Sequence, residues 1–217
     1  MTTVFSFNYL LYLLKGMGWT LVLSALAFVL GGFGGALVMF ARISRIAFVR
    51  AFAIVYIQII QGTPLLIVLF VVYFGLSIIG IELPPLVAAG ISLMIYCSAF
   101  LGEIWRGCVE AVPRTQSEAS ECLAMSRWQS LIFVILPQAV RIATPSTVGF
   151  MVQVVKGTSL ASVVGFVELT RAAQILNNSI FEPFLVFGIA GFFYFSICYP
   201  LSAWSRALER KLNVGRS

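Results

Sequence analysis

Long apolar stretches without a charged residue constrain the fold of this chain more than any other feature of its sequence. Four of them are long enough to cross a hydrocarbon core of about 30 Å, and a fifth becomes so if Arg141 and Lys156 extend their charges to the interfaces. The five stretches are residues 16–41, 51–81, 83–102, 142–155 and 183–205. The 217-residue chain is 60% hydrophobic and 10% charged, with a mean hydropathy of +1.02. We therefore predict an all-α membrane protein with about five transmembrane helices, forming a single transmembrane domain over residues 1–217.

Basic residues outside these stretches predict how the chain crosses the membrane, because cytoplasmic segments carry an excess of Lys and Arg. Five spans place the two ends on opposite sides. With the N-terminus outside, eleven basic residues face the cytoplasm and three face the exterior. The cytoplasmic group is Arg42, Arg45, Arg50, Arg106, Arg114, Arg127, Arg141, Arg206, Arg210, Lys211 and Arg216, and the outer group is Lys15, Lys156 and Arg171. This bias predicts a cytoplasmic C-terminus, and it explains the net charge of +6 without a nucleic-acid partner.

Several groups on which enzymes depend are missing from the sequence. It contains no histidine, the commonest general base and metal ligand. Its four cysteines form no C-x-x-C pair and are predicted to be free thiols. No Gly-Lys dipeptide occurs, so the usual phosphate-binding loop is absent as well. We expect no catalytic residue, no metal site and no cofactor in this chain.

Three local patterns bear on how the spans pack. The cluster Gly31, Gly32, Gly34 and Gly35 indicates either a seam where another helix approaches closely or the general tolerance of membrane helices for glycine. Pro64 predicts a bend at membrane depth, where the freed backbone groups must face protein or water. Glu103 and Arg106 share one helical face, which favours an ion pair at the interface.

The longest polar interval, residues 103–141, contains an amphipathic pattern between Glu118 and Pro137. Polar and apolar side chains alternate there at helical spacing, so we expect one helix with a packed face and a wet face. This pattern alone fits either an ordinary interfacial helix or a docking surface for a partner.

A motif inside this interval resembles the cytoplasmic loop of the membrane subunits of bacterial ABC importers. Glu118, Ala119 and Ser120 occupy its E-A-A positions, and Val134, Leu136 and Pro137 occupy its I-x-L-P. Two residues depart from the motif: Ser120 replaces an alanine, and Ala124 replaces a glycine. Ala124 is harmless within a helix but unfavourable in a turn that needs a positive φ. The resemblance implies a coupling loop over about residues 107–137, in which Glu118 and a group of Leu123, Met125 and Trp128 bind an ATPase.

Further motifs resemble importers of polar amino acids. Residues 61–66 (Q-G-T-P-L-L), 156–160 (K-G-T-S-L) and Glu168-Leu169 follow in the family's order, and the similarity covers roughly residues 55–205. It implies a substrate path along Thr63, Ser98, Lys156, Thr158, Ser159 and Glu168. Gly157 stands where the family has Asp. The hydroxyls among these residues need hydrogen-bond partners at membrane depth, which are either other helix groups or a solute.

The resemblance implies a permease subunit with the type I ABC importer fold, in the inner (plasma) membrane of a bacterium. Its expected partners are an ATP-binding subunit that holds ATP and Mg, a second and unlike permease subunit, an amino-acid-binding protein outside, and membrane lipid. Without a row of intramembrane carboxylates, a proton-coupled carrier is the weaker alternative. A channel subunit, an ABC permease for another small solute and a purely structural subunit are the others. The missing carboxylate at Gly157 favours an acidic or neutral amino acid over a basic one.

Overall fold

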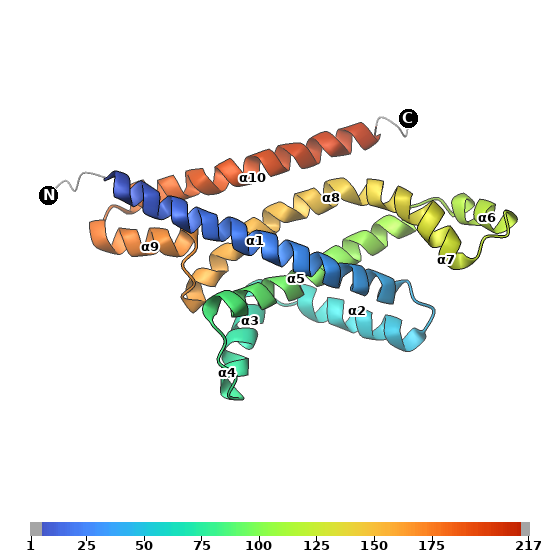
Figure 1. The fold of residues 1–217 in the computed structure, drawn as a ribbon, viewed down its shortest axis with the longest axis horizontal. Coiled ribbons are helices and arrows are strands. Elements are labelled where there is room, and N and C mark those ends of the chain that lie inside the picture. The colour runs from blue at the N-terminus through green and yellow to red at the C-terminus, as the bar shows by residue number, and fades with distance from the viewer. Residues whose placement is uncertain (1–5, 214–217) are drawn as a thin grey trace.

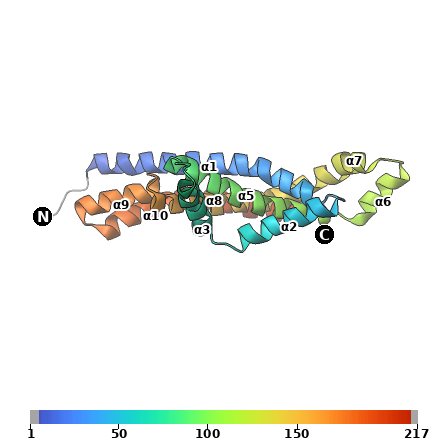
Figure 2. The ribbon, with the colours of Figure 1, turned by 90° about the horizontal axis from the view of Figure 1, so that it is seen from below.

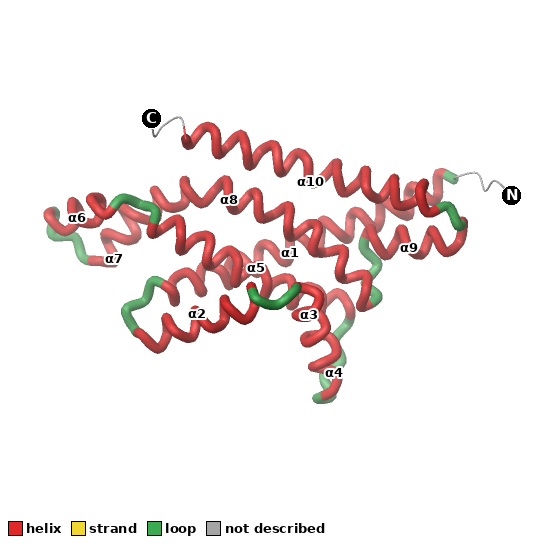
Figure 3. Tube along the Cα trace, turned by 180° about the vertical axis from the view of Figure 1, so that it is seen from behind, coloured by secondary structure: helices red, strands yellow, loops and turns green. Residues whose placement is uncertain are grey.

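A computed structural model describes residues 6–213, and within them every regular element is a helix. The α-helices are α1 (Phe7–Arg42), α2 (Ala47–Gln61), α3 (Leu65–Phe70), α4 (Leu76–Ile78), α5 (Pro85–Glu110), α6 (Arg114–Cys122), α7 (Arg127–Gln129), α8 (Leu136–Gly157), α9 (Leu169–Ile180) and α10 (Pro183–Asn213). Two π-helical segments, Val71–Gly75 and Ser130–Ile135, join α3 to α4 and α7 to α8 without a break, and the 3₁₀ segment Thr158–Val164 directly follows α8. The remaining connections are short turns (Figure 3).

The described residues contain four helices that are long and apolar enough to cross a membrane, and one bent helix pair that makes a fifth crossing if it counts as one span. The four are α1, α5, the continuous stretch Arg127–Val164 that includes α8, and α10. They extend roughly along the long axis of a flattened molecule (Figures 1 and 2). The start of α1 and the end of α10 lie at opposite ends of that axis, as an odd number of crossings requires. Which end faces the cytoplasm remains a prediction.

The second predicted span is the bent pair. Helix α2 ends at Gln61, Gly62 caps it, and α3 starts after Pro64 with its axis turned by 103° (Figure 1). The cause is Pro64, which has no N–H to continue the helix. The bend predicted at this proline is confirmed.

The glycine cluster of α1 is a packing seam against α5. A Cβ atom added at Gly34 would lie 2.8 Å from the Cβ of Ser98, and one added at Gly35 would lie 2.9 Å from the Cβ of Leu101. Both distances are shorter than normal carbon contacts, so only glycine lets the two backbones approach this closely. The packing interpretation of the cluster is confirmed.

Buried side chains form two main clusters. The larger joins α1, α3, α5 and α8 around Leu23, Leu93 and Val154. The smaller joins the start of α1 to α9 and α10 around Leu13. This packing explains why α1 begins at Phe7, whereas the predicted span began at Gly16. Large apolar side chains elsewhere are exposed, among them Phe184, Phe192 and Phe195 of α10, as expected for a surface that faces lipid or another subunit.

Candidate coupling loop and membrane path

The loop between α5 and α8 folds as two helices and not as the single amphipathic helix that we predicted. Helix α6 stops at Cys122, and a new helix starts after Ser126. The Ser126 Oγ accepts from the Gln129 N–H and the Gln129 side chain accepts from the Ser126 N–H, so the second helix has a complete capping box. Apolar periodicity cannot detect such a break, because both helices continue the same alternation.

The turn that ends α6 is a Schellman motif with Ala124 at the left-handed position. The Met125 N–H donates to the Ser120 carbonyl at 3.1 Å, and the Ala124 N–H donates to the Glu121 carbonyl at 2.9 Å. Ala124 has a φ of 53°. The departure from glycine in the motif therefore falls where alanine is conformationally unfavourable.

We expect Ala124→Gly to stabilise this turn by about 1 kcal/mol, because the left-handed conformation costs an L-residue about that much more than it costs glycine. The measurement is amide hydrogen exchange of residues 119–126 in the purified protein, which should slow about fivefold. Ala119→Gly is the matched control: Ala119 is exposed within α6, where glycine costs about 1 kcal/mol and exchange should accelerate. Faster exchange in Ala124→Gly would contradict the strain assigned to Ala124.

The predicted coupling residues divide between an inner and an outer face of the loop. Ser120 is buried, and its Oγ lies 2.6 Å from the Oγ of Ser130, which ties α6 to the segment leading into α8. The other predicted coupling residues lie on the outer face of the loop. Met125 is half-buried, and the exposed ones are Glu118, Ala119, Leu123, Ala124, Trp128 and Pro137. Leu123 and Trp128 are 77% and 67% exposed, an unusual state for apolar groups of this size on a loop that extends beyond the helix bundle (Figure 1).

The hydroxyls predicted along the substrate path all have hydrogen-bond partners, as expected. Thr63, Thr158 and Ser159 each donate to a carbonyl oxygen of the preceding turn at 2.7 Å. Ser98 donates to the Ile95 carbonyl at 2.8 Å and also lies 2.6 Å from the Tyr56 hydroxyl of α2. These partners belong to the helices, so the contribution of the hydroxyls to a path stays a prediction.

The two remaining positions near the end of α8 have different surroundings. Lys156 is exposed. Gly157 faces α3 and α5, where an added Cβ would lie 3.0 Å from the Leu65 Cδ2 and 3.4 Å from the Leu93 Cδ2. Position 157 thus adjoins the helix that starts at the Pro64 bend, and its surroundings are apolar.

Glu168, predicted along the substrate path, is fully buried and caps the N-terminus of α9. Its carboxylate accepts from the N–H groups of Thr170 and Arg171 and from the Tyr194 hydroxyl, each at 2.8 Å, and from the Thr20 hydroxyl at 3.4 Å. Burial raises the pKa of Glu168, and these donors act in the opposite direction. The sequence gives no sign of the partners on α1 and α10, which lie 148 and 26 residues away.

An ion-pair network joins the ends of α1 and α5. The predicted pair is confirmed, with an Arg106 nitrogen 2.6 Å from the Glu103 carboxylate. Arg42 also donates to Glu103, at 3.3 Å, and Arg106 pairs with Glu110 as well. The contact of Arg42 was not predicted, because Arg42 lies 61 residues before Glu103 in the sequence.

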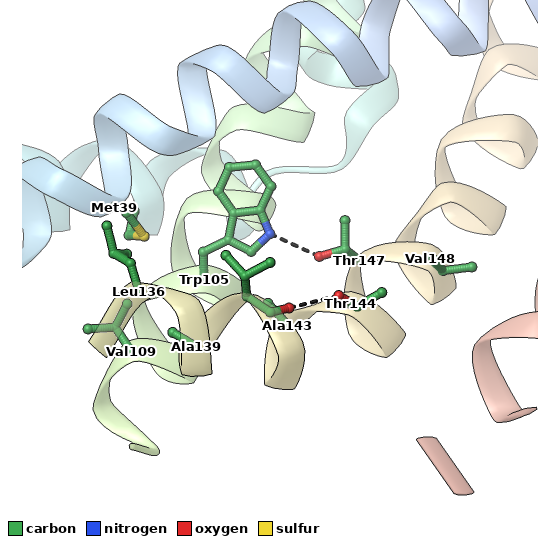
Figure 4. Close-up of a pocket in the computed structure, with 10 residues that line it drawn as sticks. Met39, Trp105, Val109, Leu136, Ala139, Ala143, Thr144, Thr147 and Val148 are labelled. Carbon is green, nitrogen blue, oxygen red and sulfur yellow. Dashed lines mark hydrogen bonds between the residues drawn. The ribbon is translucent and has the colours of Figure 1, made fainter. Parts of the chain in front are cut away.

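Close to this network lies an apolar pocket of about 300 Å³ between α1, α5 and α8 (Figure 4). At its rim the Trp105 indole N–H donates to the Thr147 hydroxyl at 2.9 Å. Met39, Val109 and Leu136 are among the apolar side chains that line it. The sequence did not predict this pocket.

The fold is that of the membrane subunits of type I ABC importers. The structure superposes with a TM-score of 0.91 on a chain from the crystal structure of an amino acid ABC transporter with histidines, at 31% identity over 97% of this chain and 100% of that one. It superposes with a TM-score of 0.72 on a chain of the inward-facing MetNI methionine ABC transporter, at 18% identity over 94% of this chain and 99% of that one.

Residues 27–214 match the family described as the binding-protein-dependent transport system inner membrane component, and the chain belongs to this family. It is 34% identical to the probable amino-acid ABC transporter permease protein YckA of Bacillus subtilis (strain 168), over 92% of this chain and 88% of that protein. It is 33% identical to the glutamine transport system permease protein GlnP of Escherichia coli (strain K12), over 93% of both. The chain is thus an ABC transporter permease of the polar amino acid importer family, a multi-pass protein of the bacterial inner membrane.

Proposed function

We propose that this permease subunit forms the translocation path of an ATP-driven polar amino acid importer together with a second, unlike permease subunit. A separate ATP-binding subunit, which holds ATP and Mg, supplies the energy through the loop Glu118–Pro137. A binding protein outside the membrane delivers the amino acid. The observation that carries this proposal is the loop itself, with its exposed Glu118, Leu123 and Trp128 on a chain without a nucleotide-binding motif.

The geometry of the bent span supports a substrate path beside α3. The 103° bend at Gly62–Pro64 interrupts the backbone of the second span at membrane depth, and polar backbone is tolerated there only where it meets protein or a wet cavity. Gly157 lies next to α3, which starts at this bend. Its surroundings of Leu65 and Leu93 offer no carboxylate for a cationic side chain, so we assign the importer an acidic or neutral amino acid.

The test is uptake of labelled glutamine, glutamate and arginine by the complete transporter in proteoliposomes, with the binding protein added outside. We expect uptake of glutamine or glutamate that requires ATP inside and is unaffected when a proton gradient is collapsed. Uptake that follows the proton gradient without ATP would identify a secondary carrier. A preference for arginine would contradict the argument from Gly157.

A further inference from the structure

A groove of about 840 Å³ opens between the end of α1 and the coupling loop. The turn between α1 and α2 forms one wall, and α6, α7 and the following π-helical segment form the other, at the same end of the molecule (Figures 1 and 2). Glu118 and Leu123, which the proposed function places against the ATP-binding subunit, do not line this groove, whereas Met125 and Trp128 do.

The side chains of the groove are both basic and apolar. Arg45, Arg114 and Arg127 line it, and the described residues offer none of these three guanidinium groups an ion-pair partner within 4.0 Å. Two carboxylates also line it, but Glu110 is already paired with Arg106, which leaves Glu121 alone against three arginines. The groove therefore has an excess of positive charge over an apolar floor that includes Ile43 and Leu131.

The apolar pocket beside Trp105 adjoins this groove. Val109 of α5 lines both, and the neighbouring residues Ile135 and Leu136 are divided between them. Along α5, the pocket side begins at Trp105, whereas the groove reaches Val112 just beyond the helix end. A basic, open compartment thus adjoins a smaller, apolar one at a predicted membrane interface.

We propose that the groove and the pocket together bind one anionic phospholipid of the cytoplasmic leaflet. The phosphate lies against Arg45 and Arg127, and part of an acyl chain enters the pocket beside Trp105. Basic pockets between transmembrane helices on the cytoplasmic side suit anionic head groups, and a tryptophan such as Trp105 suits the interface. The inference rests on the proposed cytoplasmic position of the loop, and it does not depend on which amino acid the transporter carries.

The experiment measures lipid binding to the purified transporter complex by native mass spectrometry, with phosphatidylglycerol and phosphatidylcholine added in equal amounts. We expect the wild type to retain phosphatidylglycerol at least tenfold better. The double variant Arg45→Gln/Arg127→Gln should weaken that binding roughly 30-fold, because each basic residue near an anionic surface contributes a factor of about five. Arg45→Lys/Arg127→Lys, which keeps both charges, should retain most of it.

Arg210→Gln/Lys211→Gln is the matched control, since it removes the same charge from exposed positions of α10 outside the groove. We expect it to bind phosphatidylglycerol as the wild type does.

Equal loss of phosphatidylglycerol binding in the control and in the groove variant would overturn the proposal. So would displacement of the lipid by millimolar glycerol 3-phosphate, which would indicate a phosphate site without a chain. Lipid binding by the two permease subunits alone that is absent from the complete complex would also overturn it, because that result would assign the groove to the ATP-binding subunit. If the groove variant does not assemble, the wild-type preference for phosphatidylglycerol over phosphatidylcholine decides alone. Because no arm measures transport, a failed uptake assay leaves this result unchanged.

Discussion

Glu118→Lys is expected to reduce ATP-driven uptake by the assembled transporter at least tenfold while the permease remains folded in the membrane. The Glu118 side chain is exposed on α6, so the substitution should change the free energy of unfolding by less than about 0.5 kcal/mol. At an interface with the ATP-binding subunit, however, the reversed charge replaces an acceptor by a donor. A mismatch of that kind costs several kcal/mol, and each 1.4 kcal/mol is tenfold in binding. The measurements are co-purification of the ATP-binding subunit and uptake in proteoliposomes.

The matched control is Glu182→Lys, the same charge reversal at an exposed position between α9 and α10, at the opposite end of the molecule (Figure 1). Glu182→Lys should leave association with the ATP-binding subunit intact. Normal association and uptake in Glu118→Lys would remove the loop from the coupling mechanism. Loss of the inserted protein in both variants would point instead to a defect in membrane insertion.

Glu168→Ala is expected to destabilise the protein by about 3 kcal/mol or more. The change removes the cap of α9, which is worth about 1 kcal/mol. It also leaves buried donors without an acceptor, at a cost of about 1–3 kcal/mol each. The affected donors on other helices are the hydroxyl of Tyr194 on α10 and the hydroxyl of Thr20 on α1. For a chain of this length the loss corresponds to roughly 10 °C in Tm, measurable by tryptophan fluorescence at a fixed heating rate.

Two further variants separate the cap from the network around Glu168. Tyr194→Phe removes a single hydroxyl that contacts both Glu168 and Thr170, and we expect a loss of about 1 kcal/mol. Glu168→Asp retains a carboxylate that can cap α9 but is too short to keep every bond, so its loss should fall between the other two. A Tm for Glu168→Ala equal to that of Tyr194→Phe would show that the cap contributes nothing. In that case the burial of Glu168 would have another purpose, such as contact with solute in a different conformation.

The sequence alone determined the class of the fold and the position of its main interruption. Uncharged apolar windows can only be spanning helices, because backbone groups in lipid must be satisfied within the segment. Pro64 predicted a bend in its window, since it lacks the N–H that the helix needs, although Pro145 and Pro200 lie inside helices that continue through them. The sequence also identified the family, because the motif around Glu118 and the motif around Thr63 each consist of residues that are neighbours in the chain.

The tertiary structure decided what depends on partners distant in sequence. The role of Glu168 was set by Thr20 and Tyr194, which no local pattern connects to it. Arg42 meets Glu103 because the glycines of α1 allow α5 to approach closely, a consequence of packing and not of spacing. Ala124 adopts its left-handed turn because the bonds to Ser120 and Glu121 and the cap at Ser126 end one helix and start the next. Apolar periodicity shows which side of a helix is apolar. A turn between two amphipathic helices can keep the same alternation of polar and apolar residues, so only the three-dimensional contacts reveal the turn.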